Sequence, residues 1–142
     1  MNILISGCLL GLKCRYDAKE KKLPEIEKLI EIYNLIPVCP EQLGGLPTPR
    51  IPAERVNNKV VNQAGVDVTK EYQLGAEEAL KIAKLYNCKK AILKEKSPSC
   101  GCGKIYDGTF LKNLIVGNGF TADLLLKNGV EIFGESEIDK LK

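Results

Sequence analysis

Short apolar runs alternate with longer stretches of helical periodicity along this chain. Four runs have the length and composition of buried strands, and they lie at residues 2–6, 35–38, 90–94 and 130–133. In the stretches between them apolar residues recur every three or four positions, which indicates amphipathic helices. The pattern therefore predicts strands and helices in alternation.

Each predicted helix has a recognisable beginning or end. Pro24 suits a first turn and Asn34 an end, and the apolar face between them holds Ile26, Leu29, Ile30 and Tyr33. Thr69 is expected to cap a helix that runs to Tyr86, with a buried face made of Tyr72, Ala76, Ala79, Leu80 and Ala83. A third helix is expected from Thr121 to Lys127, closed by Asn128 and Gly129.

This alternation predicts an α/β fold in a single domain that spans residues 1–142. We expect a mainly parallel sheet with right-handed crossovers and helices on both faces, a Rossmann-like three-layer sandwich. The 142 residues suffice to bury a core around such a sheet. Ligands of these folds bind beyond the carboxyl ends of the strands, so that edge is where a site is expected.

Two connections are too long to be simple links. One runs from Pro40 to Val68 and is rich in proline, glycine and asparagine, and the other runs from Glu95 to Asn113. Loops of this length in compact domains are usually functional or disordered. Asn57 and Asn58 are expected to turn a small hairpin inside the first connection, which would order part of it.

Charge and composition narrow the class of protein. The net charge is +3, and basic residues alternate with acidic ones, so binding to nucleic acid is unsupported. Lys13, Arg15 and Asp17 interrupt the apolar start, which fits neither a signal peptide nor a membrane span, and we expect a cytoplasmic protein. In that reducing compartment six cysteines point to metal ligation or reactive thiols rather than disulfides.

Three cysteines follow three predicted strands. Cys8 lies two residues past the first strand, Cys39 lies at the end of the second, and Cys100 lies in the loop after the third. Neighbouring strands are about 4.8 Å apart, so thiols at their ends can reach a common centre. Because the cysteines arrive singly rather than in close pairs, the arrangement favours an iron-sulfur cluster over a structural zinc site. The alternative is that these cysteines are buried or merely reactive.

The other three cysteines are harder to assign. Cys88, between a helix and a strand, is interpreted as a buried or turn cysteine. Cys14 and Cys102 each lie near a proposed ligand in the sequence. Each is either a fourth thiolate or a reactive thiol that does not touch the metal.

Polar residues close to these cysteines are candidates for catalysis and binding. Glu41, two residues after Cys39, is the natural proton-transfer group in a chain without histidine, and otherwise a solvated loop residue. Ser97 can hydrogen-bond a substrate. Arg50 suits an anionic or carbonyl group, or pairs with a nearby acid such as Glu54, and Asp107, in an Asp-Gly turn, is a further candidate for the pocket wall.

Four motifs carry a family resemblance. They are Cys-Leu-Leu-Gly-x-x-Cys-Arg-Tyr-Asp from Cys8, Cys-Pro-Glu-Gln-Leu-Gly-Gly-Leu-Pro-Thr-Pro-Arg from Cys39, Lys-Glu-x-Ser-Pro-Ser-Cys-Gly from Lys94 and Ile-Tyr-Asp-Gly-Thr-Phe from Ile105. Together they resemble the thiouracil desulfidases, and the likeness covers essentially the whole chain. Ala18 stands where members of this family often carry glycine, and Cys102 is particular to this sequence.

The resemblance implies an enzyme with a 4Fe-4S cluster held by Cys8, Cys39 and Cys100. Its open iron would accept the sulfur of a thiolated pyrimidine such as 2-thiouracil and release it as sulfide, while water replaces the sulfur on carbon. Glu41 would move protons and Ser97 would hydrogen-bond the reacting groups. The expected partner is a small thiolated nucleobase or nucleoside.

Two other functions agree with the residues. A cluster-based sulfur carrier or transferase for RNA thiolation would use the same cysteines but would need an acceptor. A non-catalytic metal-binding interaction module would keep its function without Glu41. Fold analogy does not decide among the three.

Overall fold

In the computed structural model, residues 1–141 are described, and they form a single α/β domain built on a four-stranded parallel sheet of order β2-β1-β5-β8. Helices connect the strands, and two short hairpins extend the connections. In chain order the elements are β1 Asn2–Ser6, η1 Gly7–Leu10, α1 Ile26–Ile32, β2 Asn34–Val38, α2 Pro40–Leu43, β3 Ala53–Val56, β4 Lys59–Asn62, α3 Thr69–Leu85, β5 Lys90–Leu93, β6 Lys104–Tyr106, β7 Leu114–Val116, α4 Phe120–Lys127, β8 Glu131–Gly134 and η2 Glu135–Lys140.

The central strand β1 is apolar because both of its faces are covered. Leu4 of β1 lies opposite Ile36 of β2 and Ala91 of β5, and all the strand pairs of this sheet are parallel. Ile3, Leu4 and Ile5 have no exposed surface. A strand buried on both faces reads as a continuous apolar run, which is why the sequence predicted these strands correctly.

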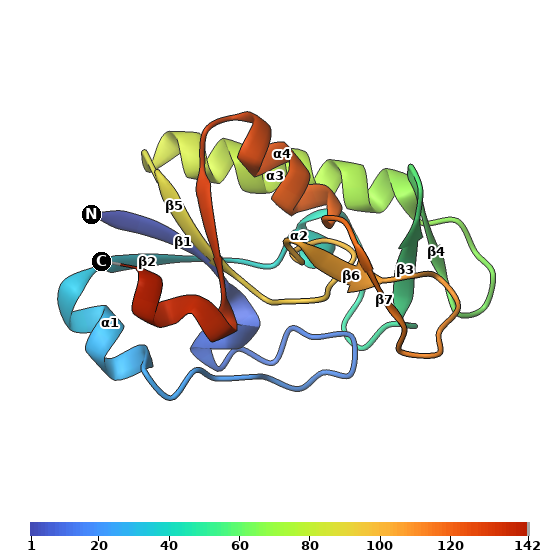
Figure 1. The fold of residues 1–142 in the computed structure, drawn as a ribbon, viewed down its shortest axis with the longest axis horizontal. Helices are drawn as coiled ribbons and strands as arrows, with labels where there is room; N and C mark the ends of the chain where they lie inside the picture. The colour runs from blue at the N-terminus through green and yellow to red at the C-terminus, as the bar shows by residue number, and fades with distance from the viewer. Residues whose placement is uncertain (142) are drawn as a thin grey trace.

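Alternate residues of the strands supply two cores. Ile3, Ile5 and Ile92 pack with residues of α1 and η2, whereas Leu4, Ala91 and Leu93 pack with residues of α3 and α4. Figure 1 shows α3 and α4 along one side of the sheet, and α1 with η2 on the other side. Helices therefore bury both faces of the sheet.

The predicted helices are present, with two corrections. Ile30 was assigned to the apolar face of the first helix, but it is 58% exposed, because α1 turns a narrow face made of Ile26 and Leu29 toward the core. Thr69 does not cap α3. The cap position is Val68, and the Thr69 hydroxyl instead accepts a hydrogen bond from the backbone N–H of Val60 at 3.0 Å.

Both long connections contain ordered structure. The hairpin predicted at Asn57 and Asn58 is confirmed, because β3 and β4 pair antiparallel around these two residues. The second connection contains β6, which pairs antiparallel with β7. The turn expected at Asp107 and Gly108 is the start of a longer loop between these strands.

Helices α2 and α3 cross with almost no side-chain volume between them. A Cβ atom on Gly44 would lie 1.9 Å from the carbonyl oxygen of Glu71, and one on Gly75 would lie 1.9 Å from that of Pro40. Only glycine permits backbones to approach this closely. The crossing brings the first turns of α3 next to the residues that follow β2.

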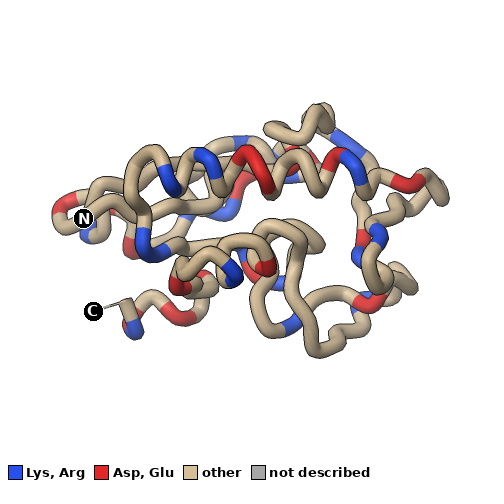
Figure 2. Tube along the Cα trace, turned by 90° about the horizontal axis from the view of Figure 1, so that it is seen from above, with Lys and Arg blue, Asp and Glu red and all other residues tan. Residues whose placement is uncertain are grey.

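Charged residues are distributed over the whole molecule. Figure 2 shows basic and acidic positions intermingled along the trace rather than gathered in one block, as the sequence indicated. Within residues 1–141, the helices are too short or too polar to cross a membrane.

Candidate metal centre

The carboxyl ends of the parallel strands gather three cysteines from distant parts of the sequence. Cys8 lies in η1 directly after β1, Cys39 directly follows β2, and Cys100 lies in the turn after β5. In Figure 1, β1 and β2 run toward the side of the molecule that carries α2 and the two hairpins. The structure thus brings the three predicted ligands to one edge of the sheet.

A cavity of about 480 Å³ occupies this edge. Four thiols line it, those of Cys8, Cys14, Cys39 and Cys100. The polar and charged side chains that share the wall include Ser6, Arg15, Glu41, Arg50, Glu54, Tyr72, Lys94 and Ser97. Thiols and ionisable groups therefore face the same space, as a reactive centre requires.

The three strand-end thiols are close enough to influence one another. Burial raises the pKa of Cys8 to about 11, although Lys94 opposes the shift, and Cys39 adds to it. Burial also raises the pKa of Cys100, followed by the charges of Glu41, Cys8 and Cys39. Burial thus makes the Cys8 and Cys100 thiols resist ionisation, and a bound cation that stabilises the thiolates reverses that preference.

Cys14 is paired with Cys39. Hydrogen bonding from the Cys14 thiol lowers the pKa of Cys39, and the same contact together with burial raises the pKa of Cys14. The Cys39 sulfur also lies 3.6 Å from the carbonyl oxygen of Cys14. Cys14 is thus within reach of a proposed ligand.

The remaining two cysteines do not line the cavity. Cys88 is 4% exposed and belongs to the apolar core between the sheet and α3, as predicted for a buried cysteine. Cys102 packs at the edge of the same core, where burial raises its pKa. The tertiary structure therefore separates Cys14 from Cys102, which the sequence had left equivalent.

Glu41 lies in the first turn of α2 and has three hydrogen-bond donors on one oxygen. Arg50 reaches its Oε2 atom through Nη2 at 3.2 Å and Nε at 3.4 Å, and the hydroxyl of Tyr72 reaches it at 3.0 Å. Glu41 is therefore not a solvated loop residue. Arg50 pairs with Glu41, not with Glu54.

All five N–H groups of Arg50 are engaged by the protein. Besides the two bonds to Glu41, Nη2 donates to the carbonyl of Cys14 at 3.0 Å, and Nη1 donates to Pro47 and Thr48 at 3.2 and 3.1 Å. Burial opposes its charge, but the charges of Glu41, Cys39 and Tyr72 together with the hydrogen bond to Glu41 raise the pKa of Arg50. The protein itself thus occupies the guanidinium donors, and a role of Arg50 in substrate binding stays a prediction.

Ser97 shapes the turn that presents Cys100. Its Oγ atom accepts hydrogen bonds from the backbone N–H groups of Ser99 at 3.0 Å and Cys100 at 3.1 Å. Its own hydroxyl hydrogen stays available to donate, and Ser97 lines the cavity. The position therefore suits the hydrogen-bonding role that the motif implies.

Asp107 is not part of the cavity wall. Its carboxylate accepts bonds from the backbone and hydroxyl of Thr109, which hold a local turn and lower its pKa. The neighbouring Tyr106 and Phe110 line the cavity instead. The turn predicted here thus contributes aromatic rings rather than an acid.

Sequence reasoning did not assign Tyr72 to the site. It was placed on the buried face of its helix, where it is 2% exposed. A buried tyrosine usually needs a hydrogen-bond partner for its hydroxyl, so a tyrosine on a buried helix face predicts a polar residue next to it.

The donor set of the cavity fits an iron-sulfur cluster. Thiolates are the usual ligands of such clusters, and Arg15 and Lys94 on the wall favour thiolate charge. Within residues 1–141, no three Cys, Asp or Glu side chains converge tightly enough for a single metal ion. A cluster binds its cysteines through different irons, so its ligands need not meet at one point.

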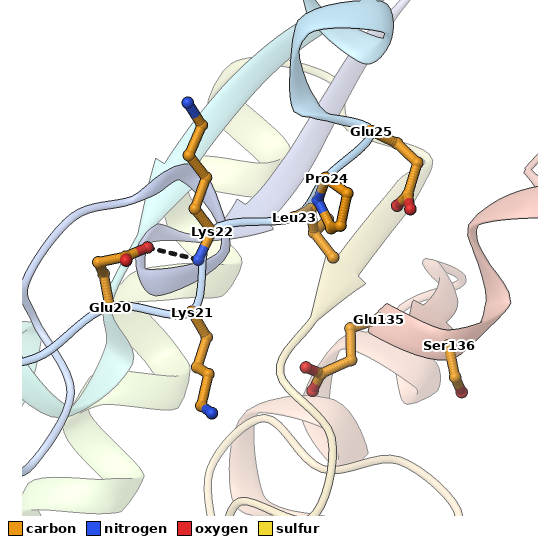
Figure 3. Close-up of a pocket in the computed structure, with 8 residues that line it drawn as sticks. All are labelled: Glu20, Lys21, Lys22, Leu23, Pro24, Glu25, Glu135 and Ser136. Atoms are coloured by element: carbon orange, nitrogen blue, oxygen red, sulfur yellow. Dashed lines mark hydrogen bonds between the residues drawn. The ribbon is translucent and has the colours of Figure 1, made fainter.

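A second, open hollow of about 440 Å³ lies between residues 20–25 and the start of η2. Figure 3 shows the side chains of Lys21 and Glu135 at its rim, and Lys21 borders the thiol-lined cavity as well. It has no cysteine in its wall. We assign it no chemistry.

Fold and site together define the class of protein, an α/β domain with a thiol-lined, cluster-competent cavity at the carboxyl ends of its parallel strands. The family model of the 2-thiouracil desulfurases matches residues 3–137. The chain belongs to this family, as the four motifs indicated.

Two relatives support the assignment over the full length. A solved structure of a 4Fe-4S-dependent thiouracil desulfidase, TudS, superposes with a TM-score of 0.94 at 42% identity, covering 99% of this chain and 94% of that one. The uncharacterized protein YbbK of Bacillus subtilis strain 168 is 42% identical over 149 residues, covering 98% of this chain and 99% of YbbK. The chain therefore shares both fold and length with its relatives.

Proposed function

We propose that this protein removes sulfur from thiolated pyrimidines such as 2-thiouracil, and that Cys8, Cys39 and Cys100 hold the 4Fe-4S cluster that the reaction needs. The observation that carries the proposal is the convergence of these thiols with the Glu41 carboxylate on one cavity, in a chain that matches a 4Fe-4S-dependent desulfidase throughout its length. We further propose that residues 1–142 act as one Rossmann-like three-layer domain.

A bound 4Fe-4S cluster supplies an iron with one open coordination position, which is a soft Lewis acid for thiocarbonyl sulfur. Glu41 takes a proton from a water molecule as the water oxygen bonds to the thiocarbonyl carbon. Glu41 returns that proton to the sulfur. It then takes the remaining proton from the hydroxyl on carbon and delivers it to the departing sulfur as the carbon–sulfur bond breaks, which leaves C=O and hydrogen sulfide. The overall change is C=S plus water to C=O plus hydrogen sulfide, so no oxidant or reductant is needed.

Other residues of the cavity bind and orient. The Ser97 hydroxyl donates to the substrate while its oxygen holds the turn before Cys100. Tyr106 and Phe110 offer aromatic surface of the kind that stacks on a flat ring. The volume of about 480 Å³ suits a small nucleobase or nucleoside beside the cluster. Six free thiols also suit a reducing compartment such as the cytosol.

The test is purification without oxygen, assay of iron and acid-labile sulfide, and incubation with 2-thiouracil. We expect iron and sulfide in the protein, followed by release of free sulfide and uracil without any acceptor. A cluster that needs an added acceptor would indicate a sulfur transferase instead. Protein that takes up zinc but no iron on reconstitution would contradict the proposal.

A further inference from the structure

We propose that Tyr72 and Arg50 clamp one oxygen of Glu41, Oε2, and thereby leave Oε1 as the oxygen that exchanges protons with water and substrate. Tyr72 is then a positioning residue for desulfidation. The inference rests on the proposed function for its catalytic meaning, whereas the clamp itself is a property of the protein alone.

The two carboxylate oxygens of Glu41 have very different surroundings. Oε2 accepts from the Tyr72 hydroxyl at 3.0 Å and from Arg50 at 3.2 and 3.4 Å. Within residues 1–141, Oε1 has no hydrogen-bond partner, although Glu41 lines the cavity. A general base needs an oxygen that is free to accept the reacting proton, and of the two oxygens only Oε1 is free of protein donors within residues 1–141.

Both donors are themselves rigid. The Arg50 side chain is 5% exposed, and its other N–H groups bind Cys14, Pro47 and Thr48. Tyr72 is 2% exposed. Burial and the Glu41 carboxylate raise the pKa of the Tyr72 phenol, so it stays protonated and acts as a donor. Hydrogen bonds to a carboxylate are stronger when both partners are largely buried than at the surface.

The fold explains why Tyr72 reaches Glu41 across 31 residues of sequence. Glu41 lies in α2 and Tyr72 in the first turn of α3, and these helices cross at Gly44 and Gly75 with their backbones nearly in contact. A larger residue at either glycine would separate the helices. The glycine pair thus sets the distance over which the clamp acts.

The decisive experiment compares Tyr72→Phe with Tyr33→Phe. Each substitution removes only a hydroxyl, and Tyr33 is a matched control because its hydroxyl donates to the carbonyl of Leu141 at 2.9 Å, on the other face of the sheet. We expect Tyr72→Phe to lower kcat for 2-thiouracil by about 10- to 100-fold with little change in KM, because the base loses its alignment. Iron and acid-labile sulfide should stay at the wild-type level in both variants.

A second measurement needs no turnover. Hydrogen-bond donors on only one oxygen of a carboxylate increase the frequency difference between its asymmetric and symmetric stretching bands. The bands of Glu41 are identified by subtracting the infrared spectrum of the Glu41→Gln variant from that of the wild type. In a Tyr72→Phe background, the separation between these bands should shrink. Arg50→Lys keeps the positive charge but loses the planar guanidinium, and it should reduce the band separation as well.

The outcomes distinguish the two proposals. Unchanged band separation, or a kcat of Tyr72→Phe equal to that of Tyr33→Phe in active protein, overturns the clamp. If wild-type protein releases no sulfide, the proposed function fails, and the infrared result alone then decides whether the clamp exists.

Discussion

At the scale of single residues, the cysteines allow a direct test of which side chains bind the cluster. Cys100 lines the cavity, whereas Cys88 is equally buried in the apolar core away from it. We expect Cys100→Ser to lose most of its iron after anaerobic reconstitution, because a hydroxyl does not replace a thiolate on a cluster. Iron content and visible absorption measure the effect.

Cys88→Ser is the control for that substitution. It introduces the same hydroxyl at a buried position, so its cost in stability should be comparable, but its iron content should equal that of the wild type. Equal loss of iron from both variants would mean that destabilisation, not ligation, governs cluster binding.

Glu41 is the residue whose removal should stop the chemistry without emptying the site. Glu41→Gln keeps the shape of the side chain but removes its basicity, and we expect kcat to fall by about 10²- to 10⁴-fold, as is usual for a general base. Iron, acid-labile sulfide and the melting temperature should change little. Full sulfide release by this variant would assign proton transfer to another group.

At the scale of elements, the crossing of α2 and α3 is the most sensitive contact. Replacing glycine by alanine inside a helix normally stabilises it by up to about 1 kcal/mol. At Gly75 the added Cβ would lie 1.9 Å from a backbone carbonyl, which cannot move aside as a side chain does. We therefore expect Gly75→Ala to lower the free energy of unfolding by about 1–3 kcal/mol, as overpacking does.

Gln73→Ala, on the exposed side of the same helix, is the matched control and should leave stability nearly unchanged. Chemical denaturation measures both variants. Gly75→Ala should also reduce kcat, since it moves Tyr72 away from Glu41. A gain in stability at Gly75 would show that the helices relax apart at no cost.

At the scale of the whole molecule, the cluster should cross-link the loops that follow three different strands. Metal that binds only the folded site stabilises the fold and its local structure. After removal of iron with a chelator, we expect faster hydrogen exchange in residues 39–52 and 94–103. The strands β1 and β5 should stay protected because their core is apolar and complete.

Helix α1 serves as the internal reference in that experiment, since it covers the sheet without lining the thiol cavity. Its exchange should not depend on iron. A uniform acceleration throughout the chain would instead mean that the cluster supports global folding rather than one edge of the sheet.

The sequence by itself determined the order of the four parallel strands and of α1, α3 and α4 between them. Strands buried on both faces are continuous apolar runs, and the apolar residues of a helix recur every three to four positions. It also placed Cys8, Cys39 and Cys100 at one edge, since all strands of a parallel sheet end on the same side. Those inferences depend on local periodicity and on topology.

Only the tertiary structure decided the contacts inside the cavity. Whether Arg50 would pair with Glu41, whether Cys14 or Cys102 would join the thiols, and whether Tyr72 would find Glu41 all depend on how loops and helices pack. The Tyr72 contact exists because two glycines let α2 and α3 touch, a match between residues far apart in the chain. The spacing of apolar residues does not predict such contacts, because it indicates which face of a helix or strand is buried but not which residues pack against that face.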